Sequence, residues 1–342
     1  MNIYITCYFV LWLFSFLYLF VRRFGKKILY LLACLTLLPL IVFRAPTIGA
    51  DTPIYCRAFI RASSMSWMDC FKTSWEPGLL LLMKLIATVF SNDVRVYIFV
   101  FGLICLLPLY VTIYKNVEYP IVGLLVFFTI FFRSAEYLNR HWIAMLIVIS
   151  SLPFIVQRKP VKFFFLVLCA AFFHRTALVF SVFYFLNQIP LNKITVLASL
   201  PTTVIVWMAG PYFRRFFNVF ARNELILETR GGYALLVFLW LCFFICYTLL
   251  YRRKDGKISL FLKMLLFAAV SQPLVFTFHI WARMLYFSFS LVYLLPIALH
   301  ELLENSNVEN RKMTIPVLFV FNSLLFLFFI KDGFEPFVLM PL

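Results

Sequence analysis

Long apolar runs recur along almost the whole chain, and they constrain its fold more than any other feature. A helix needs about 20 apolar residues to cross a hydrocarbon core roughly 30 Å thick. These runs are solid rather than alternating, which favours helices over a β-barrel. They lie near residues 2–21, 28–43, 96–114, 120–132, 140–156, 194–209, 233–251, 258–280, 282–303 and 313–330. The sequence therefore predicts an all-α, polytopic transmembrane helical bundle of about 10–12 spans.

Composition excludes the main alternatives to a membrane protein. Hydrophobic residue types make up 64% of the 342 residues and charged types 13%. Soluble globular domains have about 45–50% and about 25% of these types. An ordinary cytosolic enzyme, a disordered chain and a small disulfide scaffold are therefore excluded. No Gly/Ser linker or internal repeat divides the chain, so we expect residues 1–342 to form a single integral membrane domain.

Two regions do not fit a simple span. Residues 77–90 form a short apolar run that carries Lys84. Residues 163–187 form a long run that His174 and Arg175 interrupt. We expect residues 77–90 to enter the outer leaflet without crossing, and residues 163–187 to form a broken helix or hairpin.

The net charge of +17 is best interpreted by side of the membrane. Lys and Arg in short loops mark the cytoplasmic side, which assigns residues 22–27, 157–162 and 252–257 to the cytoplasm and the N-terminus to the outside. The largest outer, periplasmic loops are then residues 44–76 and 210–232, and almost all outer basic residues are arginines. Arginine binds phosphate through its planar fork, so the outer arginines indicate a site for an anionic headgroup. The alternative for any single arginine is that its side chain only extends to the membrane–water interface, where its charge is hydrated.

The segment 44–55 leaves the second apolar run and enters the outer region. Pro46 and Gly49 interrupt its regular backbone. Asp51 can orient an arginine, accept a hydrogen bond from a sugar hydroxyl, or act as a base. Because Asp51 precedes Thr-Pro, it equally fits the N-cap of a following helix, and both interpretations stay open.

Four further side chains stand at predicted helix ends or breaks. Glu76 precedes a proline at a helix start, where its charge suits the N-terminus and where burial would raise its pKa toward that of a general acid or base. Arg140 lies at the start of a predicted span, where burying an unpaired guanidinium in the membrane costs free energy. His174 and Arg175 interrupt an apolar run, and ionisable residues within a predicted span suggest a functional role. Of the two, histidine is the side chain suited to proton transfer near neutral pH. The alternatives are a helix-start glutamate and a hydrogen-bonded core histidine.

The sequence contains no motif that is typical of a metal-binding or nucleotide-binding site. No His/Cys spacing suits zinc, and no P-loop or dinucleotide glycine pattern occurs, so we expect neither a metal nor a cofactor. Cys56 and Cys70 share the large outer segment, where an oxidising compartment would permit a disulfide. The alternative is that Cys56 faces a helix core.

The order of these motifs resembles the EpsG family of Wzy-type bacterial polysaccharide polymerases. The resemblance spans about residues 40–300. Its matching positions are Arg44, Asp51, Thr52, Tyr55, Glu76, Pro77, Gly78, Asn139, Arg140, Ala144, His174, Ala177, Arg283, Tyr286 and Pro296. Two departures occur. Relatives often have Gly-Thr-Asp where this chain has Gly49-Ala50-Asp51, and Arg-Gln where it has Arg140-His141.

The resemblance implies a membrane glycosyltransferase that joins oligosaccharide repeat units carried on undecaprenyl diphosphate. The growing glycan would leave its lipid diphosphate and be transferred to the non-reducing end of the next unit, in a GT-C-like architecture without a nucleotide sugar. The reaction would take place on the periplasmic side of the bacterial cytoplasmic (inner) membrane. The implied partners are the lipid-linked donor and acceptor, with a chain-length regulator and a flippase of the same pathway, and no nucleic acid.

Within that reaction the candidate residues take two roles. The candidate bases for the acceptor hydroxyl, in order of preference, are Glu76, Asp51 and His174. The candidates for diphosphate or substrate binding are Arg44, Arg140, Arg283, Arg175, Arg57, Tyr55 and Tyr286. Stabilisation of a charged leaving group is usually a large catalytic effect. An O-antigen ligase, a flippase or other transporter of lipid-linked oligosaccharide, and a structural membrane protein stay open as alternatives.

Overall fold

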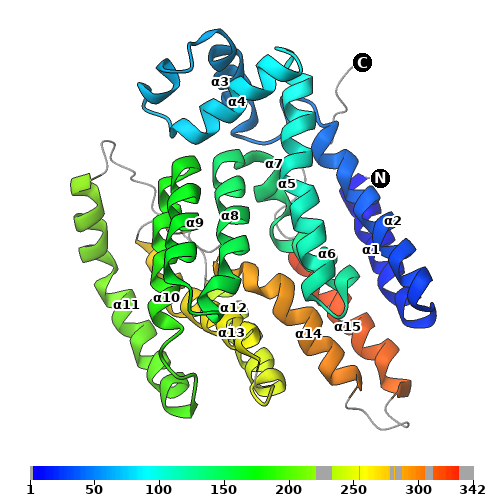
Figure 1. Ribbon diagram of the computed structural model, residues 1–342. Helices are drawn as coiled ribbons and strands as arrows, with labels where there is room; N and C mark the ends of the chain where they lie inside the picture. Colours follow the sequence, from blue (N-terminus) through cyan, green and yellow to red (C-terminus); the bar gives the residue numbers. More distant parts are fainter. Residues whose placement is uncertain are drawn as a thin grey trace. The chain divides into compact units, whose positions relative to one another are not determined.

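The computed structural model describes residues 3–220, 233–253, 255–277, 281, 287–304 and 311–330, and within these residues the regular elements are all helices (Figure 1). Seven of the described helices are long and apolar enough to cross a membrane. They are α1 (Ile3–Phe20), α2 (Arg23–Val42), α5 (Val94–Asn116), α8 (Asn139–Val156), α11 (Lys193–Phe220), α12 (Tyr233–Leu250) and α13 (Gly256–Ser271), which η3 (Gln272–Phe276) continues. The predicted all-α, polytopic bundle is confirmed.

The other predicted runs form shorter apolar segments. These are α4 (Pro77–Val89), α6 (Pro120–Ile130), α9 (Pro160–Phe173), η2 (Arg175–Ser181) with α10 (Val182–Leu186), α14 (Leu291–Glu304) and α15 (Arg311–Ile330). The 13 residues of α4 rise about 20 Å, which is less than the roughly 30 Å of a hydrocarbon core. This length suits a segment that enters a membrane without crossing it. The predicted break at His174 is confirmed, because α9 ends at Phe173 and η2 begins at Arg175.

The segment expected to be the largest outer loop, residues 44–76, is about half helical. It contains α3 (Thr52–Ser64) and the short turn η1 (Asp69–Phe71). Cys56 and Cys70 are both buried there, with free thiols. In the second expected loop, α11 extends to Phe220, and residues 221–232 lie outside the described part of the chain.

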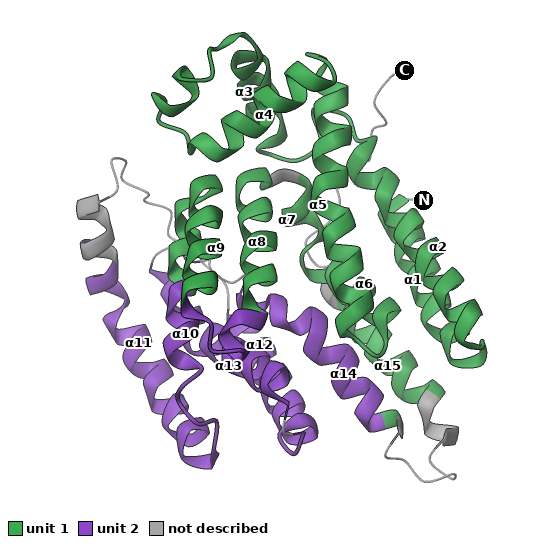
Figure 2. Ribbon diagram, viewed as in Figure 1, with its two compact units in different colours: residues 1–152, 161–180, 303–342 green, residues 153–160, 181–302 purple. Residues whose placement is uncertain are grey.

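The chain divides into two compact units (Figure 2). Unit 1 comprises residues 1–152, 161–180 and 303–342, and unit 2 comprises residues 153–160 and 181–302. Within unit 1, α15 comes from the far end of the chain and packs against α1 and α6.

Buried hydrogen bonds fix α15 in place within unit 1. Asn322 donates from Nδ2 to Ser15 Oγ at 2.8 Å, and the Tyr8 hydroxyl donates to the Asn322 carbonyl. The Tyr119 hydroxyl donates to the Ser15 carbonyl. Polar groups between apolar helices must find partners in this way, because no water competes for them in a membrane interior.

A single glycine brings the start of α4 against the end of α9. A Cβ atom at Gly78 would lie 2.7 Å from the carbonyl oxygen of Phe172, which is closer than side-chain carbon atoms tolerate. Glycine therefore permits this contact between two segments that are far apart in sequence. The contact places Glu76, two residues before Gly78, beside His174, two residues after Phe172.

Candidate functional site

Glu76 stands at the N-terminus of α4 with its carboxylate directed away from the helix. Its backbone is extended (φ −64°, ψ 126°), and its side chain makes no capping hydrogen bond. Oε2 accepts a hydrogen bond from Nη1 of Arg140 at 2.7 Å, and Oε1 lies 3.2 Å from Nδ1 of His174. The carboxylate therefore joins the first turn of α8 to the break after α9.

Two aromatic rings complete the surroundings of Arg140. The guanidinium carbon lies 5.0 Å from the centre of the Trp75 ring, a cation–π distance. The Tyr55 and Trp75 rings meet edge to face, with centroids 5.7 Å apart. Burial raises the pKa of the Tyr55 phenol, while the charge of Arg140 and its hydrogen bond to Tyr55 oppose this rise. We call Tyr55, Trp75, Glu76, Arg140 and His174 the Glu76 cluster.

The net pKa shift of Glu76 is downward. Burial alone raises the pKa of this carboxyl, but the hydrogen bond to His174 and the positive charge of Arg140 outweigh burial and lower it from 4.5 to about 2. Burial acts on the pKa of Glu76 in the expected direction, but the expected net rise is wrong, because two partners from distant parts of the chain reverse the effect. Glu76 is ionised at neutral pH.

An ionised carboxylate fixes the tautomer of His174. Because such a carboxylate only accepts hydrogen bonds, the hydrogen between Oε1 of Glu76 and Nδ1 of His174 must belong to the histidine. A neutral His174 ring then carries its lone pair on Nε2. The His174 side chain is 9% exposed, and His141 stands beside it with ring centroids 4.9 Å apart.

Two buried nitrogens of the Glu76 cluster have no hydrogen-bond partner in the described part of the chain. They are Nε of Arg140, which is a donor, and Nε2 of His174. Buried polar atoms without partners are costly. One donor and one acceptor left over in the same cluster match a ligand that carries both hydroxyl groups and negatively charged oxygens.

Arg44 lies in a different environment. It is 2% exposed, its Nη1 donates to the carbonyl of Ile41 at 2.7 Å, and its Nη2 donates to the carbonyl of Glu136. The Tyr4 hydroxyl donates to the Glu136 carboxylate at 2.9 Å. Arg44 thus ties the end of α2 to α7 (Phe132–Tyr137), and neither of these hydrogen bonds goes to the Glu76 cluster. The sequence offered no signal for Glu136, which is an isolated acidic residue 92 positions from Arg44.

The other predicted site residues that the structure describes are not members of the Glu76 cluster. Asp51 is half-buried at the N-cap of α3, where its backbone carbonyl, rather than its side chain, accepts the capping hydrogen bonds. Arg57 is exposed on α3, and Arg175 is exposed at the start of η2. Arg283 and Tyr286 lie outside the described residues. Within the described part of the chain, no group of three or more His, Cys, Asp and Glu could hold a metal ion.

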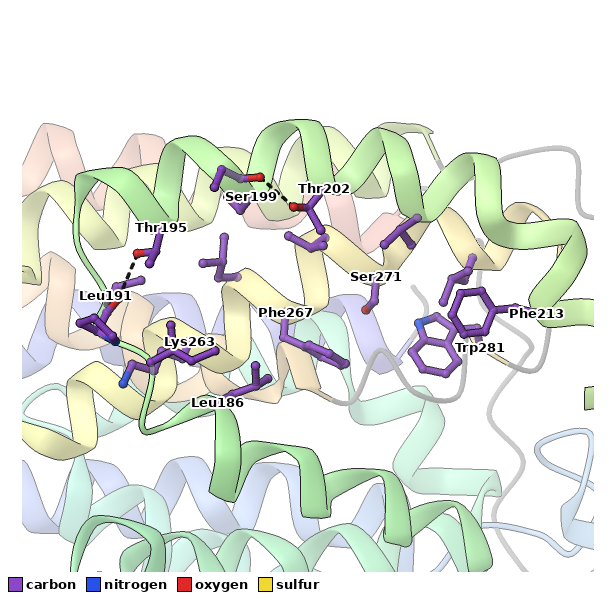
Figure 3. Close-up of a pocket in the computed structure, with 17 residues that line it drawn as sticks. Leu186, Leu191, Thr195, Ser199, Thr202, Phe213, Lys263, Phe267, Ser271 and Trp281 are labelled. Atoms are coloured by element: carbon purple, nitrogen blue, oxygen red, sulfur yellow. Dashed lines mark hydrogen bonds between the residues drawn. The ribbon is translucent and has the colours of Figure 1, made fainter. Parts of the chain in front are cut away.

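Unit 2 contains a groove of different character, with a volume of about 550 Å³ (Figure 3). It runs between α11 and α13, from Lys263 near one end to Phe213 and Trp281 at the other. The hydroxyls of Thr195 and Thr202 donate to backbone carbonyls of their own segment, so the groove presents mainly carbon. Such a lining favours a hydrocarbon chain over a sugar.

Acid should destabilise the protein through Glu76. Because the pKa of Glu76 is lower in the folded state than its ordinary value of 4.5, its stabilisation is complete above about pH 4.5 and is lost as the pH falls toward 2. The full loss corresponds to about 3 kcal/mol. We expect the thermal unfolding midpoint of the detergent-solubilised protein to fall more between pH 5 and pH 2.5 than that of Glu76→Gln. Equal decreases in both proteins would contradict the shift.

The comparisons with known proteins bear on the whole chain. No curated protein and no solved structure matches it. The EpsG family matches over residues 27–338, which is nearly the full length. This range includes every member of the Glu76 cluster, all of unit 2 and most of unit 1, so the predicted resemblance is confirmed. The chain belongs to the EpsG family, a family of Wzy-type polysaccharide polymerases.

Proposed function

We propose that this chain joins oligosaccharide repeat units carried on a lipid diphosphate, and that the Glu76 cluster is the catalytic centre. One observation carries the proposal. An ionised carboxylate holds an arginine and a histidine so that each keeps one buried nitrogen without a partner, Nε of Arg140 and Nε2 of His174. Family membership supplies the class of reaction.

The chemistry follows from those two nitrogens. Nε2 of His174 accepts the proton of the acceptor hydroxyl as its oxygen attacks the anomeric carbon of the donor. The bond between that carbon and the diphosphate oxygen breaks, and the electron pair leaves with the diphosphate. Arg140 stabilises the negative charge that develops there. The displacement is direct, without a covalent intermediate on the enzyme.

Under this proposal Glu76 is a positioning residue rather than the base. A carboxylate whose pKa is about 2 is a poor proton acceptor at neutral pH, but it orients His174 and supports an imidazolium once the proton has moved. Asp51 is the remaining carboxylate candidate. Arg283 and Tyr286 keep their proposed place in substrate binding, and the contacts of Arg44 suit a structural role.

We place the reaction on the outer, periplasmic side of the cytoplasmic membrane. The support is the density of basic residues in segments 22–27, 157–162 and 252–257, which marks them as cytoplasmic. The Glu76 cluster includes residues from the 44–76 segment, which this orientation puts outside.

The donor we propose is undecaprenyl diphosphate-linked oligosaccharide, and the apolar groove of unit 2 has a lining that suits a polyprenyl chain. A chain-length regulator and a flippase of the same pathway are the partners we propose.

Reconstitution tests the function. Purified protein in liposomes is incubated with one undecaprenyl diphosphate-linked repeat unit, and the products are separated by size. We expect a ladder of oligomers and release of undecaprenyl diphosphate, with none in protein-free liposomes. In a parallel incubation that also contains a lipid A core, a single transfer to that core would indicate an O-antigen ligase. Movement of the substrate across the bilayer without any covalent product would indicate a flippase, and either result would overturn the proposal.

A further inference from the structure

A second cavity in unit 1 borders the Glu76 cluster and is strongly basic. It has a volume of about 450 Å³, and its lining includes Arg57, Arg61, Lys72, Ser74 and Trp75. Volumes of this order hold small ligands, here one or two sugar rings. We call it the α3 pocket.

The residues that line the α3 pocket carry positive charges that no acidic residue of the lining neutralises. Arg57 and Arg61 lie four residues apart on α3, so they share one helix face, where like charges repel. Lys72 adds a third positive charge, and no acidic residue belongs to the lining. Asp69 pairs with Lys72 at 3.1 Å, but both side chains are well exposed, and such pairs contribute little. A bound anion would relieve the repulsion and engage both arginines.

Trp75 connects the α3 pocket to the catalytic centre. It lines the pocket, and its ring also contacts Arg140 at 5.0 Å and Tyr55 at 5.7 Å. The pocket and the Glu76 cluster therefore share one wall. A sugar in the pocket would share the Trp75 ring with Arg140 of the Glu76 cluster.

We propose that the α3 pocket binds a sugar that carries an anionic substituent, a carboxylate or a phosphate, within the repeat unit. This inference rests on the proposed polymerase function and names the class of glycan it acts on. The same anion chemistry is present in the lipid diphosphate. The structure favours the sugar-borne anion, because Arg140 is available to the diphosphate and because the α3 pocket adds polar and apolar surface around its charges.

The test combines binding measurements with glycan chemistry. The repeat-unit oligosaccharide is released from the polymer of cells that carry the chain, and a second portion is neutralised by carboxyl reduction or dephosphorylation. Binding of both oligosaccharides and of sugar-free undecaprenyl diphosphate is measured on the wild type and on Arg57→Gln/Arg61→Gln. Arg22→Gln/Arg23→Gln is the matched control, since both of its sites are exposed arginines outside the pocket.

We expect the charged oligosaccharide to bind at least about tenfold more weakly to Arg57→Gln/Arg61→Gln, with undecaprenyl diphosphate unaffected and the control equal to wild type. The neutralised oligosaccharide should bind the wild type as weakly as the charged one binds the variant. Unchanged affinity for undecaprenyl diphosphate also shows that the variant is folded.

Two outcomes would overturn the inference. One is a polymer without carboxylate or phosphate, and the other is a variant that loses affinity only for undecaprenyl diphosphate. A neutral polymer that still requires this chain would leave the polymerase function standing, whereas polymer that persists after deletion of the chain would refute that function itself.

Discussion

Arg140→Ala should abolish polymer while the protein stays in the membrane. The variant loses the group that stabilises charge on the departing diphosphate, an effect that typically costs about 10²–10³ in rate. It also leaves the Glu76 carboxylate, which is 8% exposed, without its partner at 2.7 Å. Its rate of repeat-unit joining is measured in liposomes, with membrane-inserted protein quantified in parallel.

Two companion variants separate charge from geometry at this position. Arg140→Lys keeps a positive charge but loses the planar fork, so we expect a rate between those of Arg140→Ala and wild type. Arg252→Ala removes an exposed arginine in unit 2 and should leave the rate unchanged. Long polymer made by Arg140→Ala would refute its role in holding the diphosphate.

Arg140 and Glu76 should also depend on each other. If the carboxylate acts mainly by holding Arg140 and His174, Arg140→Ala combined with Glu76→Gln should lose far less than the sum of the two single losses, in free-energy terms. A fully additive double variant would mean that the two residues act separately. Glutamine has nearly the size of glutamate but no charge. Any change in the rate of Glu76→Gln therefore comes from the lost charge rather than from a packing defect.

The apolar pattern was sufficient to predict the long apolar helices in the described part of the chain, but not α3, which lies in a segment expected to be a loop. Solid runs specify where each of these apolar helices lies, and the His174-Arg175 interruption coincides with the end of α9 at Phe173. The short run at residues 77–90 likewise forms a helix of 13 residues. These features are local, and local physical chemistry determines them.

The partners within the site were less predictable. Glu76 and His174 are 98 residues apart, and the contact that joins them depends on Gly78 against a backbone carbonyl in another helix. The direction of the pKa shift at Glu76 depends on those partners and could not follow from burial alone. Arg44 shows the same limit, since the sequence placed it among the outer arginines and the fold buries it against Glu136.

His174→Ala should stop polymer formation at a different step. Loss of a general base typically lowers the rate about 10²–10⁴-fold, yet the Arg140 guanidinium that receives the diphosphate remains. We therefore expect His174→Ala to bind undecaprenyl diphosphate-linked repeat unit with nearly wild-type affinity and to join units hardly at all. Binding and joining are measured on the same liposome preparation, which separates this variant from Arg140→Ala.

Chemical rescue distinguishes a base from a structural histidine. The alanine variant leaves space where the imidazole ring stood, beside the Glu76 carboxylate that oriented it at 3.2 Å. Added imidazole should restore part of the rate of His174→Ala in a concentration-dependent way and should leave His300→Ala, a substitution in α14 of unit 2, unaffected. A merely structural role would give no rescue. If His174→Ala stays active while Glu76→Gln is inert with normal binding, the proton goes to Glu76 instead, and the downward pKa shift of that carboxyl must be reversed when substrate displaces Arg140 from it.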